Sequence, residues 1–218
     1  MPGSVHTTAV FSELVIKEQS LHIIRKKEQK MSLLDLECQK SVSSSKDCLY
    51  IDGNKEYLRL GCDYQIYLSF SFPPYSCLKY LKQAKLILFK IPAQFFGVQT
   101  TDKCDHYSIY PLLDFFSPYS CIFTPPAIDF SRKETFEDNE CSSYTEADIT
   151  PIVKAWINEE VENKGILLTG NLETRLITYA SDRYIIKGLH PFLRLNYVET
   201  DLCQPYSTTP CTIEINTP

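Results

Sequence analysis

The stretch from residue 148 to residue 197 constrains the fold most, because turn residues divide it into one short helix and several strand-like runs. Thr150 suits a helix cap and Pro151 suits the first helical position. Apolar residues then recur at the i, i+4 spacing, so one side of the helix should face a core. This helix, near residues 150–158, carries Trp156, the only tryptophan of the chain.

Three strand-like runs follow the helix, and they are rich in β-branched, leucine and aromatic residues. They cover residues 166–169, 176–179 and 192–197, with turn-forming residues between them. We expect Trp156 to be buried against strand residues such as Leu167 and Leu193. One short helix packed on many strands is typical of an all-β fold, an antiparallel β-sandwich.

The composition suits a single all-β domain. With 218 residues, of which 44% are hydrophobic and 12% aromatic, the chain is long enough to bury one sizeable core. Its 14 Tyr and 12 Phe residues suit strands whose half-buried faces carry aromatic rings. The net charge of -5 gives no basic field, so we expect no nucleic-acid partner.

The same residues resemble a known family. The matching pattern is Asp148-Ile149-Thr150-x-x-Val153-x-x-Trp156, Asn163-x-Gly165-Ile166-Leu167-Leu168, Ser181-Asp182-Arg183 and Pro191-x-Leu193-x-Leu195-x-Tyr197. It resembles the C-terminal half of the DNRLRE domain, a family similar to archaeal disaggregatase repeats and common in bacterial surface proteins. Residues 42–45, 57–60 and 84–89 resemble its first half more loosely. The resemblance covers about residues 41–198 and implies a jelly-roll-like, non-catalytic sandwich, similar in outline to carbohydrate-binding modules.

Three parts are expected along the chain. Residues 1–40 form an N-terminal extension, residues 41–198 the sandwich, and residues 199–218 a tail that contains cysteine and proline. In the tail, Thr212 to Asn216 alternates in polarity as an edge strand does. Such a segment can return to its own sheet or add to the sheet of a neighbouring copy.

No apolar run in the first 30 residues reaches the length of a secretory signal, and none in the chain is long enough to span a membrane. We therefore expect a chain made in the cytoplasm without a signal peptide. Arg25-Lys26-Lys27-Glu28 ahead of Met31 is what a ribosome-binding leader would encode, so the native start is either Met1 or Met31.

The nine cysteines leave two interpretations open. They are either reduced, scattered thiols of a cytosolic protein, or thiols oxidised later, as on a spore surface after the mother cell lyses. Under the second interpretation Cys38, Cys203 and Cys211, which lie outside the predicted strands, should be exposed and form disulfides between subunits.

The sequence predicts no catalytic site, metal site or cofactor. No nucleophile stands beside a base in a recognised pattern, and no pair of cysteines has the C-x-x-C spacing of zinc sites. His106 and its acidic neighbours suit a polar loop better than a ligand set. Glu134, Glu137, Asp138 and Glu140 form either a solvated acidic loop or, less simply, a calcium loop that lacks the usual glycine spacing.

Four aromatic residues are candidates for stacking on a ligand, or else for packing in the core: Tyr107, Tyr110, Phe116 and Tyr119. Taken together, the sequence predicts a non-catalytic structural or adhesive subunit of a bacterial cell or spore surface. We expect it to self-assemble through disulfides and strand addition, with itself as the main partner. The alternative is a carbohydrate-binding module whose partners are surface glycans.

Overall fold

The computed structural model describes residues 30–46, 56–61, 63–74, 78, 80–91, 106–117, 124–171 and 174–198. The chain divides into two compact units, Met1–Lys30 and Met31–Pro218, and every element below belongs to the second. The predicted tail, including Cys203 and Cys211, lies outside the described residues, as does Tyr119.

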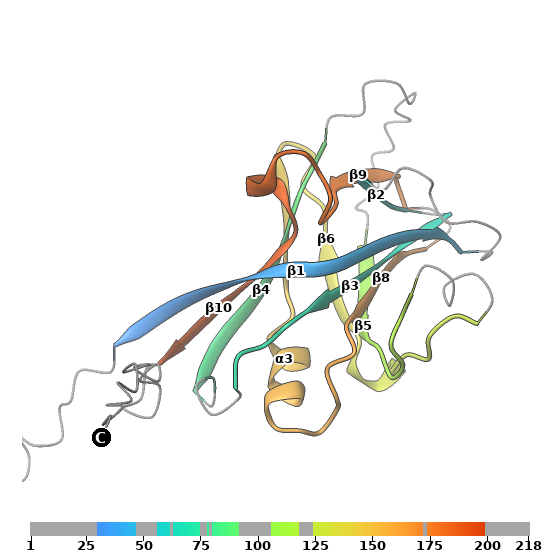
Figure 1. Cartoon of the computed structure of the whole chain (residues 1–218). Helices are drawn as coiled ribbons and strands as arrows, with labels where there is room; N and C mark the ends of the chain where they lie inside the picture. Colours follow the sequence, from blue (N-terminus) through green and yellow to red (C-terminus); the bar gives the residue numbers. More distant parts are fainter. Residues whose placement is uncertain are drawn as a thin grey trace, which may run out of the picture. The chain divides into compact units, whose positions relative to one another are not determined.

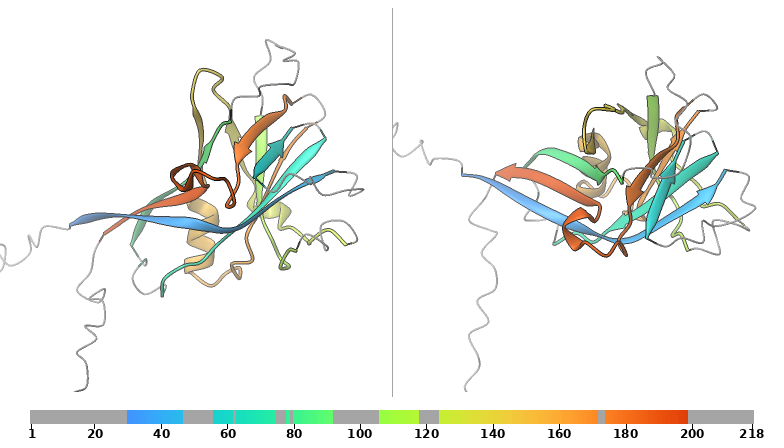
Figure 2. Two further views of the ribbon diagram at one scale, coloured as in Figure 1. Left: turned by 45° about the horizontal axis from the view of Figure 1, so that its top comes forward. Right: turned by 90° about the horizontal axis from the view of Figure 1, so that it is seen from above.

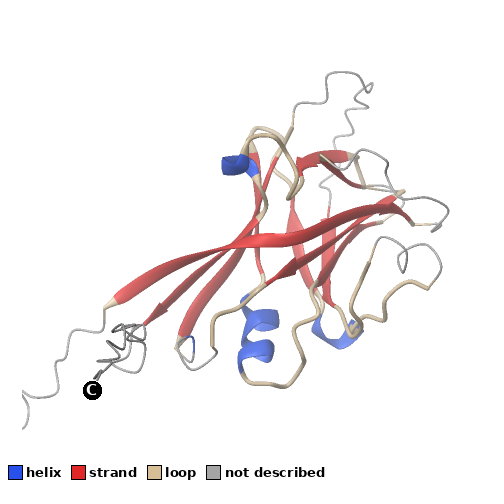
Figure 3. Cartoon of the chain, in the orientation of Figure 1, coloured by secondary structure: helices blue, strands red, loops and turns tan. Residues whose placement is uncertain are grey.

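The described part consists mainly of antiparallel strands around one α-helix (Figure 3). The strands are β1 (Met31–Ser45), β2 (Tyr57–Leu60), β3 (Tyr64–Phe70), β4 (Leu81–Phe89), β5 (His106–Pro111), β6 (Glu134–Glu137), β7 (Tyr144–Asp148), β8 (Ile166–Gly170), β9 (Ile177–Ala180) and β10 (Phe192–Val198). The helices are α3 (Thr150–Ile157) and the short 3-10 turns η2 (Phe130–Arg132) and η3 (Lys187–Leu189).

The long strand β1 belongs to two sheets at once. Its first half pairs with β10, which continues through β4 to β7, and its second half pairs with β3, which continues through β8 and β5 to β6 (Figure 1). The register shifts between Cys38 and Lys40, where β1 passes from one partner to the other. The terminal strands β6 and β7 also contact each other, so the sheet nearly closes around the core (Figure 2). The predicted all-β, jelly-roll-like antiparallel sandwich is confirmed.

The two halves of β1 are buried differently, as their sequences require. From Met31 to Glu37 exposed side chains alternate with partly buried or buried ones, as expected for a strand with one face on a core. From Val42 to Ser45 every residue is buried, because β2 lies against this half as well. The small side chain of Ser43 permits the close approach of β2, and its Oγ lies 3.0 Å from both the N and the O of Arg59.

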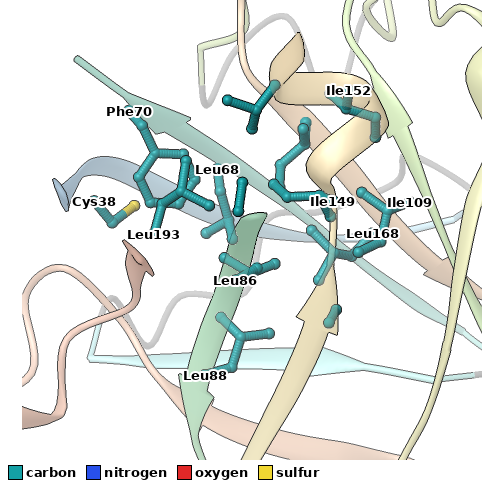
Figure 4. Close-up of a cluster of buried hydrophobic side chains, with 14 of the residues drawn as sticks. Cys38, Leu68, Phe70, Leu86, Leu88, Ile109, Ile149, Ile152, Leu168 and Leu193 are labelled. Carbon is teal, nitrogen blue, oxygen red and sulfur yellow. The ribbon is translucent and has the colours of Figure 1, made fainter. Parts of the chain in front are cut away.

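The main core lies between the sheets and is completed by α3. Ile149 and Ile152 from the helix region lie among leucines and isoleucines of both sheets (Figure 4). Trp156 is 1% exposed and meets the ring of Phe72 edge-on, with centroids 5.5 Å apart. The predicted burial of Trp156 is confirmed, and Leu193 belongs to the same cluster.

The predicted contact of Trp156 with Leu167 is wrong. Leu167 lies in a second cluster with Val42, Tyr67, Leu112 and Phe116. The next residue, Leu168, belongs to the main core. Successive side chains of a strand point to opposite faces, so β8 supplies one leucine to each cluster.

Thr150 is also not the helix cap. The helix begins at Thr150, and Ile149 occupies the cap position without a capping side chain. The Thr150 Oγ1 instead accepts a hydrogen bond of 2.8 Å from the backbone N–H of Ala84 in β4, and the Thr150 N–H donates to Asp148 Oδ1 at 2.9 Å. The threonine therefore ties the helix to the sheet.

The predicted start of the sandwich at residue 41 is wrong as well. The pairing of β1 with β10 runs from Met31, opposite Val198, to Glu37, opposite Phe192. No local pattern marks this pairing, because the partner strand lies more than 150 residues away in the sequence. The remaining predicted strands within the described residues correspond to β2, β4, β8, β9 and β10.

Replacing Trp156 with alanine should lower the free energy of unfolding by about 3–5 kcal/mol, because the change leaves a cavity in a fully buried site. Chemical denaturation followed by circular dichroism measures the effect. Ile185, which is 82% exposed, provides the control, and its alanine variant should unfold like the parent. A Trp156 variant as stable as the parent would contradict the packing of α3 on the core.

Candidate functional site

Two groups of polar side chains stand out among the described residues, and the first is buried. Asp138, in the turn between β6 and β7, has a side chain that is 0% exposed. Its carboxylate accepts hydrogen bonds from Lys90 Nζ at 2.9 Å, Arg175 Nη2 at 2.7 Å and Thr145 Oγ1 at 2.6 Å. Arg175 also pairs with Glu140. We call these groups, together with Tyr179, the Asp138 cluster.

The Asp138 cluster continues into the core through two tyrosines. The hydroxyl of Tyr179 lies 2.9 Å from Thr145 Oγ1, and that of Tyr107 donates to the backbone carbonyl of Arg175 at 2.7 Å. Burial raises the pKa of Tyr179 well above its usual value, so its hydroxyl stays protonated. The charges of Lys90 and Arg175 balance those of Asp138 and Glu140. The Asp138 carboxylate accepts hydrogen bonds from three side chains, so the arrangement suits a structural role.

The predicted acidic loop is wrong for Glu134 and Glu137, which lie in β6, and only Asp138 and Glu140 belong to the turn that follows. Asp138 is buried, whereas the side chain of Glu140 is 54% exposed. The prediction that His106 lies in a polar loop is wrong, because it is the first residue of β5 and pairs with Glu137 of β6, whose carboxylate lies 3.3 Å from the imidazole on the surface. Within the described residues, no three His, Cys, Asp or Glu side chains gather as they would around a metal ion.

Replacing Asp138 with asparagine should destabilise the fold by about 3–5 kcal/mol, because it leaves Lys90 and Arg175 facing a neutral amide in a buried place. The matched change Glu140→Gln removes a partly exposed partner of the same arginine and should cost under about 1 kcal/mol. Urea unfolding of both variants measures the difference. Equal effects of the two changes would show that burial of Asp138 does not matter.

The second polar group lines a groove at the point where β1 and β3 separate. Its volume is about 700 Å³. The lining residues come from the register shift of β1, the end of β3, the segment after β5 and the segment before β8: Gln39, Lys40, Ser69–Pro74, Phe115, Phe116 and Glu162–Lys164. We call it the Phe115 groove.

Hydrogen bonds to backbone carbonyls fix the cationic walls of the Phe115 groove. Lys40 Nζ donates to the carbonyl of Phe116 at 2.8 Å, and Lys164 Nζ donates to that of Leu113 at 3.0 Å. Lys164 also pairs with Glu162 at 3.2 Å. Each ammonium group has three N–H donors, so both lysines retain donors for a ligand.

A tight turn at residues 163–165 positions Lys164 in the groove. Asn163 donates through Nδ2 to the carbonyl of Phe70 at 2.9 Å and accepts from the N–H of Gly165 at 3.2 Å. Gly165 has φ of 107°, which favours glycine, and a Cβ there would lie 2.4 Å from the carbonyl oxygen of Leu68. The turn at residues 163–165 thus sets the position of Lys164.

The exposed aromatic ring of the groove is Phe115, which was not among the four candidates. Its side chain is 69% exposed, and Lys164 Nζ lies 5.4 Å from the ring centroid. The neighbouring Phe116 is buried at 6% exposure, in the second cluster with Tyr67. Adjacent residues of an extended segment point in opposite directions, and the sequence does not show which of the two rings faces water.

The other candidate aromatics serve in packing. Tyr107 is fully buried and stacks on Phe136, with centroids 5.2 Å apart. Tyr110 is half-buried and meets Phe130 edge-on at 5.6 Å. Of the two roles left open for Tyr107 and Phe116, the structure shows core packing, because both rings complete clusters of the sandwich.

The expectation that Cys38 is exposed is also wrong. Cys38 lies within β1 on the core side, is 6% exposed, and its Sγ donates to the carbonyl of Lys40 at 3.2 Å. Burial raises its thiol pKa to about 12, so it stays protonated and unreactive near neutral pH. Cys141, in the turn between β6 and β7, is exposed and was missed. Cys203 and Cys211 lie outside the described residues.

Comparisons with known proteins give no family assignment. No family model matches the sequence, and a search of curated proteins finds no match. In the described residues, none of the helices has the length and hydropathy needed to cross a membrane. The resemblance to the DNRLRE domain stays a prediction.

Proposed function

We propose that this chain is a non-catalytic adhesive module of a bacterial cell or spore surface, and that it binds carbohydrate in the Phe115 groove. The observation that carries the proposal is an exposed aromatic ring inside a concave site. Phe115 is 69% exposed, whereas Tyr107 and Phe116 are buried. The apolar face of a sugar ring can cover such an aromatic ring, which removes both surfaces from water.

The remaining walls of the groove supply the polar contacts that sugar hydroxyls need. Glu162 offers a carboxylate that is 67% exposed, and Lys164 offers ammonium donors beside it. Gln39, which also lines the groove, is exposed. A concave site with one aromatic platform and a few fixed polar groups is the usual form of a small-ligand site.

The groove supports binding rather than hydrolysis. Glu162 is the only acidic residue among those that line it in the described part of the chain. Glycoside hydrolysis generally requires two carboxyl groups that flank the scissile bond. The similarity in outline between DNRLRE domains and carbohydrate-binding modules is consistent with this proposal.

Replacing Phe115 with alanine should weaken glycan binding at least tenfold, because a stacking contact contributes about 0.5–1.5 kcal/mol beyond the buried area of the ring. A glycan array identifies the ligand of the parent, and calorimetry with that ligand compares the variants. Phe130, which is 75% exposed but does not line the groove, provides the control Phe130→Ala. A parent that binds no glycan, or a Phe115 variant that binds equally well, would contradict the proposal.

A second candidate function is a structural subunit joined by disulfides, and the exposure of Cys141 favours it. Since Cys38 is buried and protonated, we propose Cys141, Cys203 and Cys211 as the thiols available for bonds between copies. Air-oxidised protein should then give a ladder on non-reducing electrophoresis. The ladder should vanish when these three cysteines are changed to serine.

The variant Cys38→Ser is the matched control, and its ladder should equal that of the parent. Iodoacetamide labelling at pH 8, followed by peptide mass spectrometry, should modify Cys141 in the native protein and leave Cys38 unmodified. A parent that stays monomeric under oxidation would rule out this second function.

A further inference from the structure

The first half of β1 has a partner on one edge only among the described strands. Residues Met31 to Glu37 pair with β10, and the pairing with β3 begins at Cys38. Beyond this point β3 ends at Phe70 and the chain turns away towards Phe72, which packs on Trp156. An exposed sheet edge offers backbone groups to an added strand.

The register shows which backbone groups face this open edge. The N–H of Cys38 donates to the carbonyl of Pro191 at 2.9 Å, so this pair is a hydrogen-bonded one. Hydrogen-bonded and non-bonded pairs alternate along an antiparallel ladder. The backbone groups of Leu34 and Leu36 therefore bond to β10, whereas those of Leu33, Asp35 and Glu37 point away from it.

The side chains of this half-strand leave an apolar border on the core side. Leu36 is 9% exposed, and Leu34 is partly buried against the main core. On the other face, Leu33 is 68% exposed, and Asp35 pairs with Arg194 at 2.8 Å. A strand with two apolar residues on one face would continue the core beside Leu34 and Leu36.

We propose that this open edge, Met31–Glu37, is the docking site of residues 212–216 from the C-terminal tail of the same chain. These residues read Thr-Ile-Glu-Ile-Asn, so Ile213 and Ile215 fall on one face of an extended strand. That face matches the border formed by Leu34 and Leu36. Thr212, Glu214 and Asn216 fall on the face shared by the exposed Leu33 and Asp35.

The chain can reach this position. The tail starts after Val198, which pairs with Met31 at one end of the open edge. Residues 199–211 connect Val198 to Thr212, and a chain of this length spans up to about 45 Å. The open edge is about 23 Å long at the rise of a β-strand, so the tail reaches all of it. A tethered strand has a high effective concentration, which favours its own chain over a second copy.

Amide hydrogen exchange of the isotope-labelled full chain tests this proposal residue by residue. In the parent, the amides of Leu33, Asp35 and Glu37 should exchange about as slowly as those of Leu34 and Leu36. The double change Ile213→Asn and Ile215→Asn should accelerate the first group at least tenfold and leave the second group unchanged. The matched control changes Thr208 and Thr209 to asparagine and should leave both groups as in the parent.

Two further measurements separate the alternatives. Leu33→Pro removes one outward N–H without touching the ladder to β10, and it should speed amide exchange within residues 212–216, in an antiparallel pairing at Thr212, Glu214 and Asn216. Leu33→Thr keeps that N–H and should have no such effect. The protection of the amides of Leu33, Asp35 and Glu37 should be the same at low and high protein concentration, because the tail belongs to the same chain.

Three outcomes would overturn the proposal. The first is fast exchange of Leu33, Asp35 and Glu37 in the parent, which would show an empty edge. The second is protection that survives the change of both isoleucines, which would assign the edge to another segment, such as Thr8 to Ile16. The third is protection that appears only at high concentration, which would assign it to a second copy.

Discussion

The passage of β1 from one sheet to the other is the constraint on which the other features depend. The first half of β1 pairs with β10 and its second half pairs with β3. The register shift between Cys38 and Lys40 lies where one pairing ends and the other begins. The Phe115 groove lies beside this register shift, where β3 ends. The same divergence leaves the edge of Met31–Glu37 without β3.

Local signals predicted the second half of the sandwich well. The turn at Asn163 and Gly165 and the apolar spacing of α3 are encoded by neighbouring residues, so the helix, β8 and β10 were found at nearly their observed bounds. The start of β1 was missed because its pairing with β10 joins distant parts of the chain. The predicted contact of Leu167 with Trp156 is wrong because both faces of β8 are buried, and the sequence of a strand does not show which face packs against which cluster.

The candidate site was not predicted for the same reason: its residues are defined by contacts between distant segments. Phe115 and Phe116 are adjacent and chemically identical, and only the packing against Tyr67 shows that Phe116 is the buried one. Asp138 was assigned to a solvated loop because its partners, Lys90 and Arg175, come from distant segments. A buried charge is recognised by the partners that neutralise it, and a single sequence does not show spatial partners.

The Asp138 cluster also determines how Cys141 is presented. Lys90 holds both the carboxylate of Asp138 and the carbonyl of Asn139, at 2.6 Å, and the Asn139 side chain accepts the N–H of Cys141 at 3.0 Å. Removing one partner of a buried ion pair is costly, so this turn has one preferred arrangement. A thiol on a fixed turn can form a disulfide only with a partner that approaches in one geometry. Any bond through Cys141 would therefore define a specific interface between copies rather than random cross-links.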